Sequence, residues 1–150
     1  MHVKLDKFGK SKKLKKLNFG CGKIILKGFV NVDIQKGKGI DKHFNFNRFP
    51  YPFKNNTFDV VFAYSIFQYF PDLQYAKDVI SEMTRISRNI VFVGDLPLNS
   101  HESNHTLYSK EDFSDWEITY TFYKHYGSSR FNIYKGEWKW NGITHLVKKL

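Results

Sequence analysis

Short apolar runs recur along this chain of 150 residues and predict buried β-strands. Lys15–Phe19 is the first predicted strand, and the later runs Phe29–Ile34, Phe58–Tyr64 and Ile90–Gly94 are mostly apolar, as is typical of strands covered on both faces. A short strand is also predicted over His43–Phe46. Near the C-terminus, Trp116–Tyr123 and Arg130–Tyr134 flank a turn and predict a hairpin.

One segment between these runs has the spacing of an amphipathic helix. Its apolar residues recur every three or four positions, at Tyr75, Val79, Met83 and Ile86. Asp72 is the expected N-cap, and Asn89 is expected to mark the end of the helix. Ser109 and Asp112 have the spacing of a capping box and predict a second, short helix.

The order of these elements predicts an α/β fold with a compact, Rossmann-like, mostly parallel sheet that ends in an antiparallel hairpin. Only six residues separate Gly22 from Phe29. A parallel crossover normally needs about a dozen residues, so the first helix is expected to be reduced to a turn. We divide the chain into a flexible basic arm, 1–14, and one domain, 15–150.

The charge is unevenly distributed. The chain carries a formal net charge of +10, and residues 1–16 hold seven lysines against one aspartate. Such an arm is either a solvated tail or a weak contact for nucleic acid through phosphate groups. No apolar run reaches the length of about 18 residues that a membrane span needs, and a single cysteine favours a cytoplasmic location.

The stretch Leu17–Gly22 (LNFGCG) is followed by Gly28–Asp33 (GFVNVD). Glycines allow a backbone to approach a ligand closely, and a carboxylate at the end of the next strand can accept hydrogen bonds from a ribose diol. The dinucleotide fingerprint fails here, because Ile25 replaces its third glycine. Asp33 also follows Gly22 by 11 residues, where a dinucleotide site needs about 20.

These motifs resemble motif I and the following acidic motif of class I S-adenosylmethionine (SAM) methyltransferases, in a compact subgroup that acts on sugars or small molecules. Three later segments also resemble that family, namely 49–61 (FPYPFKNNTFDVV), 65–71 (SIFQYFP) and 82–86 (EMTRI). The resemblance implies a seven-stranded, mostly parallel sheet and SAM as the cofactor. Gln68 and Tyr69 stand where many members have a Glu-His pair.

The resemblance also implies a set of cofactor-binding residues. They are Asn18, Gly20, Cys21, Gly22, Asp33, Ile34, Asn45, Phe46, Tyr64 and Ser65. The glycine turn would pass under the methionine part, Asp33 would bind the ribose, and Asn45 would reach the adenine edge. Each has a plainer alternative, since Asp33 can form a strand-end turn, Asn45 can cap a loop, and Tyr64 can belong to the core.

No catalytic residue is assigned. His101 is the better candidate for a general base, and His101 and His105 predict no metal site, because they lie in a loop-like segment without a third ligand. The expected function is SAM-dependent methylation of a small-molecule or sugar-linked acceptor, through oxygen more than nitrogen. The alternatives are an RNA methyltransferase that uses the basic arm and a non-catalytic module that keeps the fold.

Overall fold

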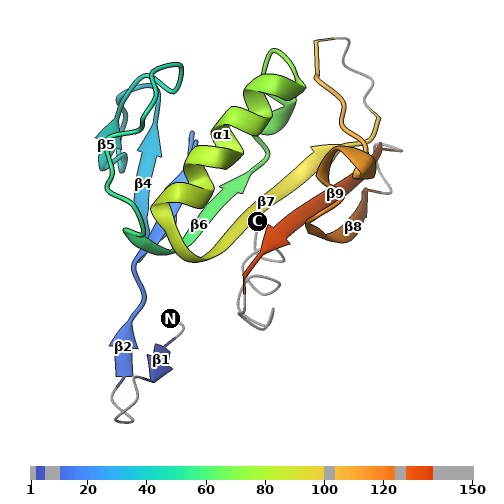
Figure 1. The fold of residues 1–150 in the computed structure, drawn as a ribbon. Coiled ribbons are helices and arrows are strands. Elements are labelled where there is room, and N and C mark those ends of the chain that lie inside the picture. The colour runs from blue at the N-terminus through green and yellow to red at the C-terminus, as the bar shows by residue number, and fades with distance from the viewer. Residues whose placement is uncertain (1–2, 6–10, 100–103, 124–127, 137–150) are drawn as a thin grey trace.

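The computed structural model describes residues 3–5, 11–99, 104–123 and 128–136 (Figure 1). Its main sheet has seven strands in the order β5-β4-β3-β6-β7-β9-β8. Their bounds are Lys16–Phe19 (β3), Val30–Asp33 (β4), Lys42–His43 (β5), Phe58–Tyr64 (β6), Ser87–Pro97 (β7), Glu117–Tyr123 (β8) and Ser128–Lys135 (β9). In this sheet the β7–β9 and β9–β8 pairs are antiparallel and the other pairs are parallel, so the predicted mostly parallel sheet with a terminal hairpin is confirmed.

Helix α1, Leu73–Ile86, lies across one face of this sheet (Figure 1). The Asp72 side chain caps it by accepting a 2.8 Å hydrogen bond from the Tyr75 N–H, as predicted. The expected end at Asn89 is wrong, because Ser87 is already extended and begins β7. The described residues also contain two 3-10 helices, η1 at Phe67–Tyr69 and η2 at Lys110–Phe113, and η2 begins with the predicted capping box at Ser109.

The connection from β3 to β4 contains only turns, as its length predicts. The strand expected over His43–Phe46 is shorter and earlier, at Lys42–His43. Phe46 lies beyond the strand, where its buried ring stacks on Phe19 with 4.3 Å between the ring centroids. An aromatic cluster therefore replaces regular structure after β5.

Alternate side chains of the central strands build two apolar layers. On the α1 face, Leu17, Val61 and Val91 pack with the buried side of the helix. On the opposite face, Phe62 and Phe92 stack on each other, with 5.3 Å between the ring centroids. No helix covers this second face among the described residues, and none of the described helices is long and apolar enough to cross a membrane.

The Glu82–Arg85 pair ties α1 to the proline-bearing loop before β6. The Arg85 guanidinium donates to both carboxylate oxygens of Glu82 at 2.7 Å, and also to the backbone carbonyl of Tyr51. The same Glu82 carboxylate accepts the Tyr51 N–H at 2.6 Å. This pairing gives the EMTRI segment a structural role in fixing the loop.

The N-terminal arm contains a two-stranded hairpin, formed by β1, Val3–Leu5, and β2, Ser11–Lys13. The sequence predicts no regular element there. The hairpin projects from the end of the sheet where β3 begins (Figure 1). Residues 124–127, which include the first half of the turn predicted over 126–129, and the tail 137–150 lie outside the described residues.

Candidate functional site

The candidate site lies at the carboxyl edge of the sheet, where β3 has β4 on one side and β6 on the other. The strand order reverses at this point, and open α/β sheets bind ligands outside the carboxyl ends of strands at such a reversal. Left-handed residues follow β3 and β6 and interrupt the regular pairing near the end of β7: Gly20 has a φ of 67°, Ser65 of 58° and Asp95 of 64°. Non-glycine residues with such backbones cluster at functional sites.

The two glycines of the turn after β3 have different surroundings. Gly20 has a φ of 67°, which favours glycine, and a Cβ there would lie 2.6 Å from Cδ1 of Ile66, so that side chain would have to shift. A Cβ on Gly22, whose φ is 51°, would meet no atom within 4 Å. The open side of Gly22 is therefore the place where a ligand can lie directly on the backbone.

Cys21, between these glycines, is buried and donates its N–H to the Val32 carbonyl at 3.0 Å. Burial, followed by the nearby Asp33 carboxylate, raises the pKa of the Cys21 thiol to about 11. The thiol is therefore neutral near pH 7, and a nucleophilic thiolate is disfavoured. Cys21 acts as a small buried residue that fixes the turn.

Asp33, at the end of β4, reaches back to the glycine turn. Its Oδ2 accepts the Gly22 N–H at 2.8 Å, and its Oδ1 accepts the backbone N–H groups of Ile34 and Gln35. A carboxylate offers about four acceptor positions, so one remains on Oδ2. Asp33 is thus a turn former that still presents a charged acceptor beside the open side of Gly22.

The side chain of Asn18 faces the linker that replaces the first helix. Its Nδ2 donates to the Ile24 carbonyl at 2.8 Å and to Asn31 Oδ1 at 2.9 Å. Asn31 Oδ1 also accepts the Leu26 N–H, and the Asn31 N–H binds Asp41 Oδ2. Asn31 and Asp41 were not predicted as site residues, although a polar residue inside an otherwise apolar strand was a signal for Asn31.

Three apolar side chains near the turn are exposed. Ile34, which follows Asp33, is 47% exposed, and Ile24 and Ile25 are 39% and 41% exposed. Large apolar residues exposed together often mark a binding surface. Ile34 is one of the residues that the family resemblance points to, whereas the sequence analysis did not select Ile24 and Ile25 for this role.

Asn45, expected at the adenine edge, and Phe46, also expected to bind the cofactor, have contacts within the protein. Asn45 Oδ1 accepts the Asn47 N–H at 2.9 Å, which is the loop-cap geometry of the plainer alternative. Phe46 packs in the aromatic cluster between Phe19 and Tyr51. Asn45 is exposed, so its amide nitrogen stays accessible from solvent.

The segment after β6 forms the next part of the edge. Ser65 Oγ accepts a 2.9 Å hydrogen bond from Nε2 of the buried Gln68. Tyr64 stacks parallel to Phe62 on the face opposite α1. The ring of the exposed Tyr69 meets that of His105 edge to face, with 5.4 Å between centroids.

His101 lies outside the described residues. Within the part of the chain that the structure describes, no group of three histidine, cysteine or carboxylate side chains is placed to hold a metal ion. The candidate chemistry therefore rests on the glycine turn, Asp33 and the segment after β6.

Solved structures with the same arrangement are SAM-dependent methyltransferases. Magnesium protoporphyrin IX methyltransferase from Synechocystis PCC 6803, with bound SAH (S-adenosylhomocysteine), has a TM-score of 0.62 and 12% identity, covering 83% of this chain and 74% of that one. A SAM-dependent methyltransferase from Methanosarcina mazei has a TM-score of 0.60 and 12% identity, covering 83% and 92%. The chain has the class I SAM-dependent methyltransferase fold.

The N-methyltransferase NodS from Bradyrhizobium japonicum WM9, also with bound SAH, has the same fold. Its TM-score is 0.58 at 9% identity, covering 84% of this chain and 79% of NodS. No family model matches the chain, and no curated protein matches it by sequence. At such identities the likeness extends to the fold, and the function must be argued from the site.

Proposed function

We propose that this protein is a methyltransferase that binds SAM at the carboxyl edge of β3 and β4 and methylates a small-molecule or sugar-linked acceptor. The observation that carries the proposal is the open side of Gly22 beside the Asp33 carboxylate. It lies where the strand order reverses, which is the usual ligand position in this class of sheet.

The residues present fit the cofactor. The backbone from Gly20 to Gly22 would pass under the methionine part, and the remaining acceptor position on Asp33 would take a ribose hydroxyl. The exposed side chains of Ile34, Ile24 and Ile25 offer apolar surface for a purine ring. SAH in two of the solved structures with this fold supports the choice of SAM.

When bound, SAM supplies an electrophilic methyl group. The work of this chain is then to align an acceptor atom with that group, and alignment alone can account for a large part of a rate enhancement. Ser65 and Tyr69 present hydroxyl groups after β6, and His105 adds a ring nitrogen near Tyr69. Such groups suit the orientation of an acceptor hydroxyl, which supports oxygen as the methylated atom.

Calorimetric titration of the full chain with SAM and with SAH tests the proposal. We expect saturable binding of both ligands, and we expect Gly22→Asn to weaken it because that side chain would enter the open side of the turn. Absence of binding to the folded wild-type chain would refute the proposal. Binding without methyl transfer to any acceptor would instead favour the non-catalytic module.

A second candidate function is methylation of RNA. One specific observation favours it, namely a cavity lined by three lysines at the opposite end of β3. The two candidate functions share the cofactor site and differ in the acceptor. A comparison of RNA and small hydroxylated compounds as methyl acceptors therefore distinguishes them.

A further inference from the structure

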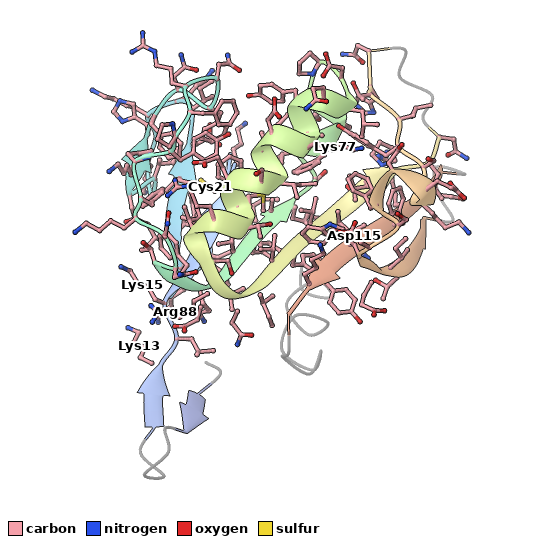
Figure 2. All side chains as sticks on the ribbon, viewed as in Figure 1. Lys13, Lys15, Cys21, Lys77, Arg88 and Asp115 are labelled. Carbon is pink, nitrogen blue, oxygen red and sulfur yellow. The ribbon has the colours of Figure 1, made fainter. Side chains whose placement is uncertain are left out.

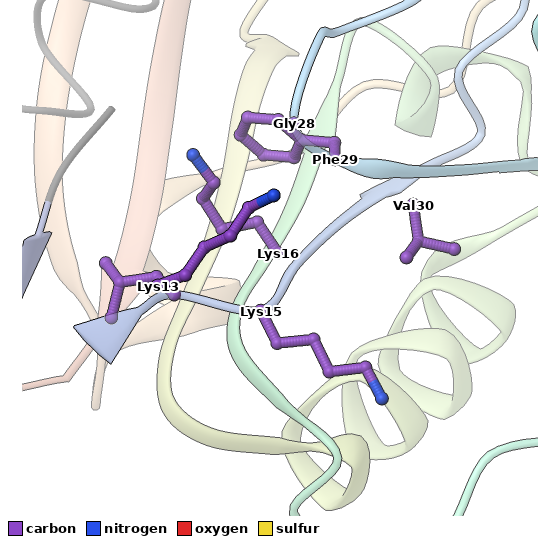
Figure 3. Close-up of a pocket in the computed structure, with 7 residues that line it drawn as sticks. Lys13, Lys15, Lys16, Gly28, Phe29 and Val30 are labelled. Atoms are coloured by element: carbon purple, nitrogen blue, oxygen red, sulfur yellow. The ribbon is translucent and has the colours of Figure 1, made fainter.

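A second concave site lies at the amino end of β3, away from the glycine turn. It has a volume of about 440 Å³ and is lined by residues 13–16 and 28–30 (Figure 3). Figure 2 labels Cys21 of the turn toward one end of the sheet and Lys13 and Lys15 at the other. The two sites are therefore separated along β3, by roughly 13 Å between Lys16 and Gly20 at about 3.3 Å per residue.

Two lysine side chains extend to the same side of this cavity. Lys13 and Lys16 both reach toward Phe29 in Figure 3, and Lys16 Nζ lies 4.7 Å from the centroid of the Phe29 ring. Lys15 points the other way, where its Nζ lies 5.3 Å from the centroid of the Phe58 ring. The cavity itself is thus framed by two ammonium groups and one aromatic ring.

The charges of this pair are not balanced by acids. Within the described residues, no carboxylate forms an ion pair with Lys13 or Lys16. Burial, followed by the charge of Lys13, lowers the pKa of Lys16 below its ordinary value. A bound anion would relieve both the repulsion and the poor solvation of this ammonium group.

The hairpin continues the positive charge beyond the cavity. Lys13 ends β2, and Lys4 and Lys12 are register partners across the hairpin. The lysine-rich sequence thus continues from the cavity into the hairpin, which suits an extended anion better than a compact one.

We propose that the Lys13–Lys16–Phe29 cavity and the adjoining hairpin bind the phosphate backbone of single-stranded nucleic acid, with a base placed against Phe29. Lysines that track a backbone beside an aromatic ring are the usual means of binding single strands. An anionic membrane fits less well. Large exposed apolar side chains, which would insert into a bilayer, occur elsewhere in the described residues and not at this cavity.

This inference goes beyond the proposed function, because the cavity lies too far along β3 to hold the atom that is methylated. A strand bound there would be tethered at one end of the sheet while the carboxyl edge stays free. The site therefore predicts affinity for RNA whether or not RNA is the methyl acceptor. If the chain does not bind RNA, the proposed SAM site is unaffected by that result.

The test is fluorescence anisotropy of a labelled single-stranded RNA of mixed sequence with the full chain, over a series of salt concentrations. The variant Lys13→Gln/Lys16→Gln shortens both side chains, keeps them polar and removes both charges. We expect its affinity to fall by about tenfold and the slope of log affinity against log salt to flatten by about 1.4, at about 0.7 per lost phosphate contact.

The matched control is Lys36→Gln/Lys38→Gln, which removes the same charge from two exposed lysines after β4. We expect it to retain most of the affinity and the wild-type slope. Equal losses in both double variants would overturn the proposal, because they would indicate attraction by net charge alone. Absence of RNA binding by the wild-type chain would also overturn it.

Two further measurements distinguish a nucleic-acid site from a site for anionic lipid. Phe29→Leu keeps an apolar side chain and removes the ring, and we expect a loss of about fivefold or more for RNA if a base stacks there. Vesicles that contain phosphatidylserine should bind more weakly than RNA at equal phosphate concentration. Stronger binding to the vesicles, or a Phe29→Leu variant that binds RNA as well as the wild type, would refute a nucleic-acid site.

Discussion

Asn18 and Asn31 are register partners on β3 and β4, and their buried side chains share a 2.9 Å hydrogen bond from Asn18 Nδ2 to Asn31 Oδ1. Through this pair, the linker between the strands is held by bonds to Ile24 and Leu26. These two asparagines therefore hold the short linker in place, where a longer crossover would have its first helix. They fix the glycine turn against β4.

The first prediction concerns that pair. Asn31→Ala removes one partner and leaves the buried Asn18 amide and the Leu26 N–H short of hydrogen bonds. We expect the free energy of unfolding to fall by about 2–3 kcal/mol, measured by urea denaturation. Asn47→Ala, an exposed asparagine in the next loop, should stay within about 0.5 kcal/mol of the wild type. Equal effects of the two substitutions would refute the bracing role.

The second prediction separates the glycines of the turn. Gly22→Asn places a side chain that tolerates the left-handed conformation into open space, so we expect a folded protein with SAM affinity reduced by about tenfold or more. Gly28→Asn is the matched control, because Gly28 has a φ of 82° and open surroundings but lies away from the carboxyl edge. Equal SAM affinities in the two variants, measured by calorimetry, would show that the ligand does not cross Gly22.

Gly20 is a poorer test of the cofactor site. A branched side chain such as that of Gly20→Val would contact Ile66 and strain a backbone with a φ of 67°. We expect this variant to lose stability as well as ligand binding, at about 1–2 kcal/mol for the backbone conformation alone. Thermal unfolding without any ligand measures that loss.

The third prediction concerns pH. Hydrogen bonds from Arg85 hold the pKa of Glu82 below its ordinary value of 4.5. Because the folded-state pKa is the lower one, the pair stabilises the protein fully above about pH 4.5, and this contribution is lost as the pH falls through the folded-state pKa. Glu82→Gln should therefore cost about 1–3 kcal/mol at pH 7.

The same substitution should also make stability less dependent on pH in the acid range. Denaturation of wild type and variant between about pH 3 and pH 7 measures both effects. A constant difference in the free energy of unfolding across that range would contradict the assignment to Glu82.

The fourth prediction concerns the N-terminal hairpin. Deletion of residues 1–13 removes β1 and β2 and four net positive charges, yet it leaves β3 and the carboxyl edge intact. We expect the SAM affinity and the turnover of a small-molecule acceptor to be unchanged, while RNA affinity falls and its salt dependence flattens. Loss of SAM binding in a folded deletion variant would show that the two ends of β3 are not independent.

The sheet and α1 could be predicted from the sequence, because the apolar runs and the helical spacing of apolar residues indicate which side chains are buried. The position of Asp33 beside the glycine turn could also be predicted, since parallel strands bring their carboxyl ends to one edge. The burial of Phe46 could not be predicted. It depends on ring contacts with Phe19, which is distant in sequence, and with Tyr51, which lies in a loop. The closeness of Ile66 to Gly20 could not be predicted either, because these residues are also distant in sequence.

Titration of SAM against wild type and Asp33→Asn tests the account most directly. Asn keeps one oxygen that can accept the Ile34 and Gln35 N–H groups, but it loses the acceptor of the Gly22 N–H as well as the charge that would bind the ribose, so thermal unfolding of the variant accompanies the titration. Asp78→Asn, on the exposed side of α1, is the matched control. We predict SAM affinity weaker by about tenfold or more in Asp33→Asn alone, equivalent to about 1.5–3 kcal/mol. Wild-type affinity in a folded Asp33→Asn protein would contradict the proposed site.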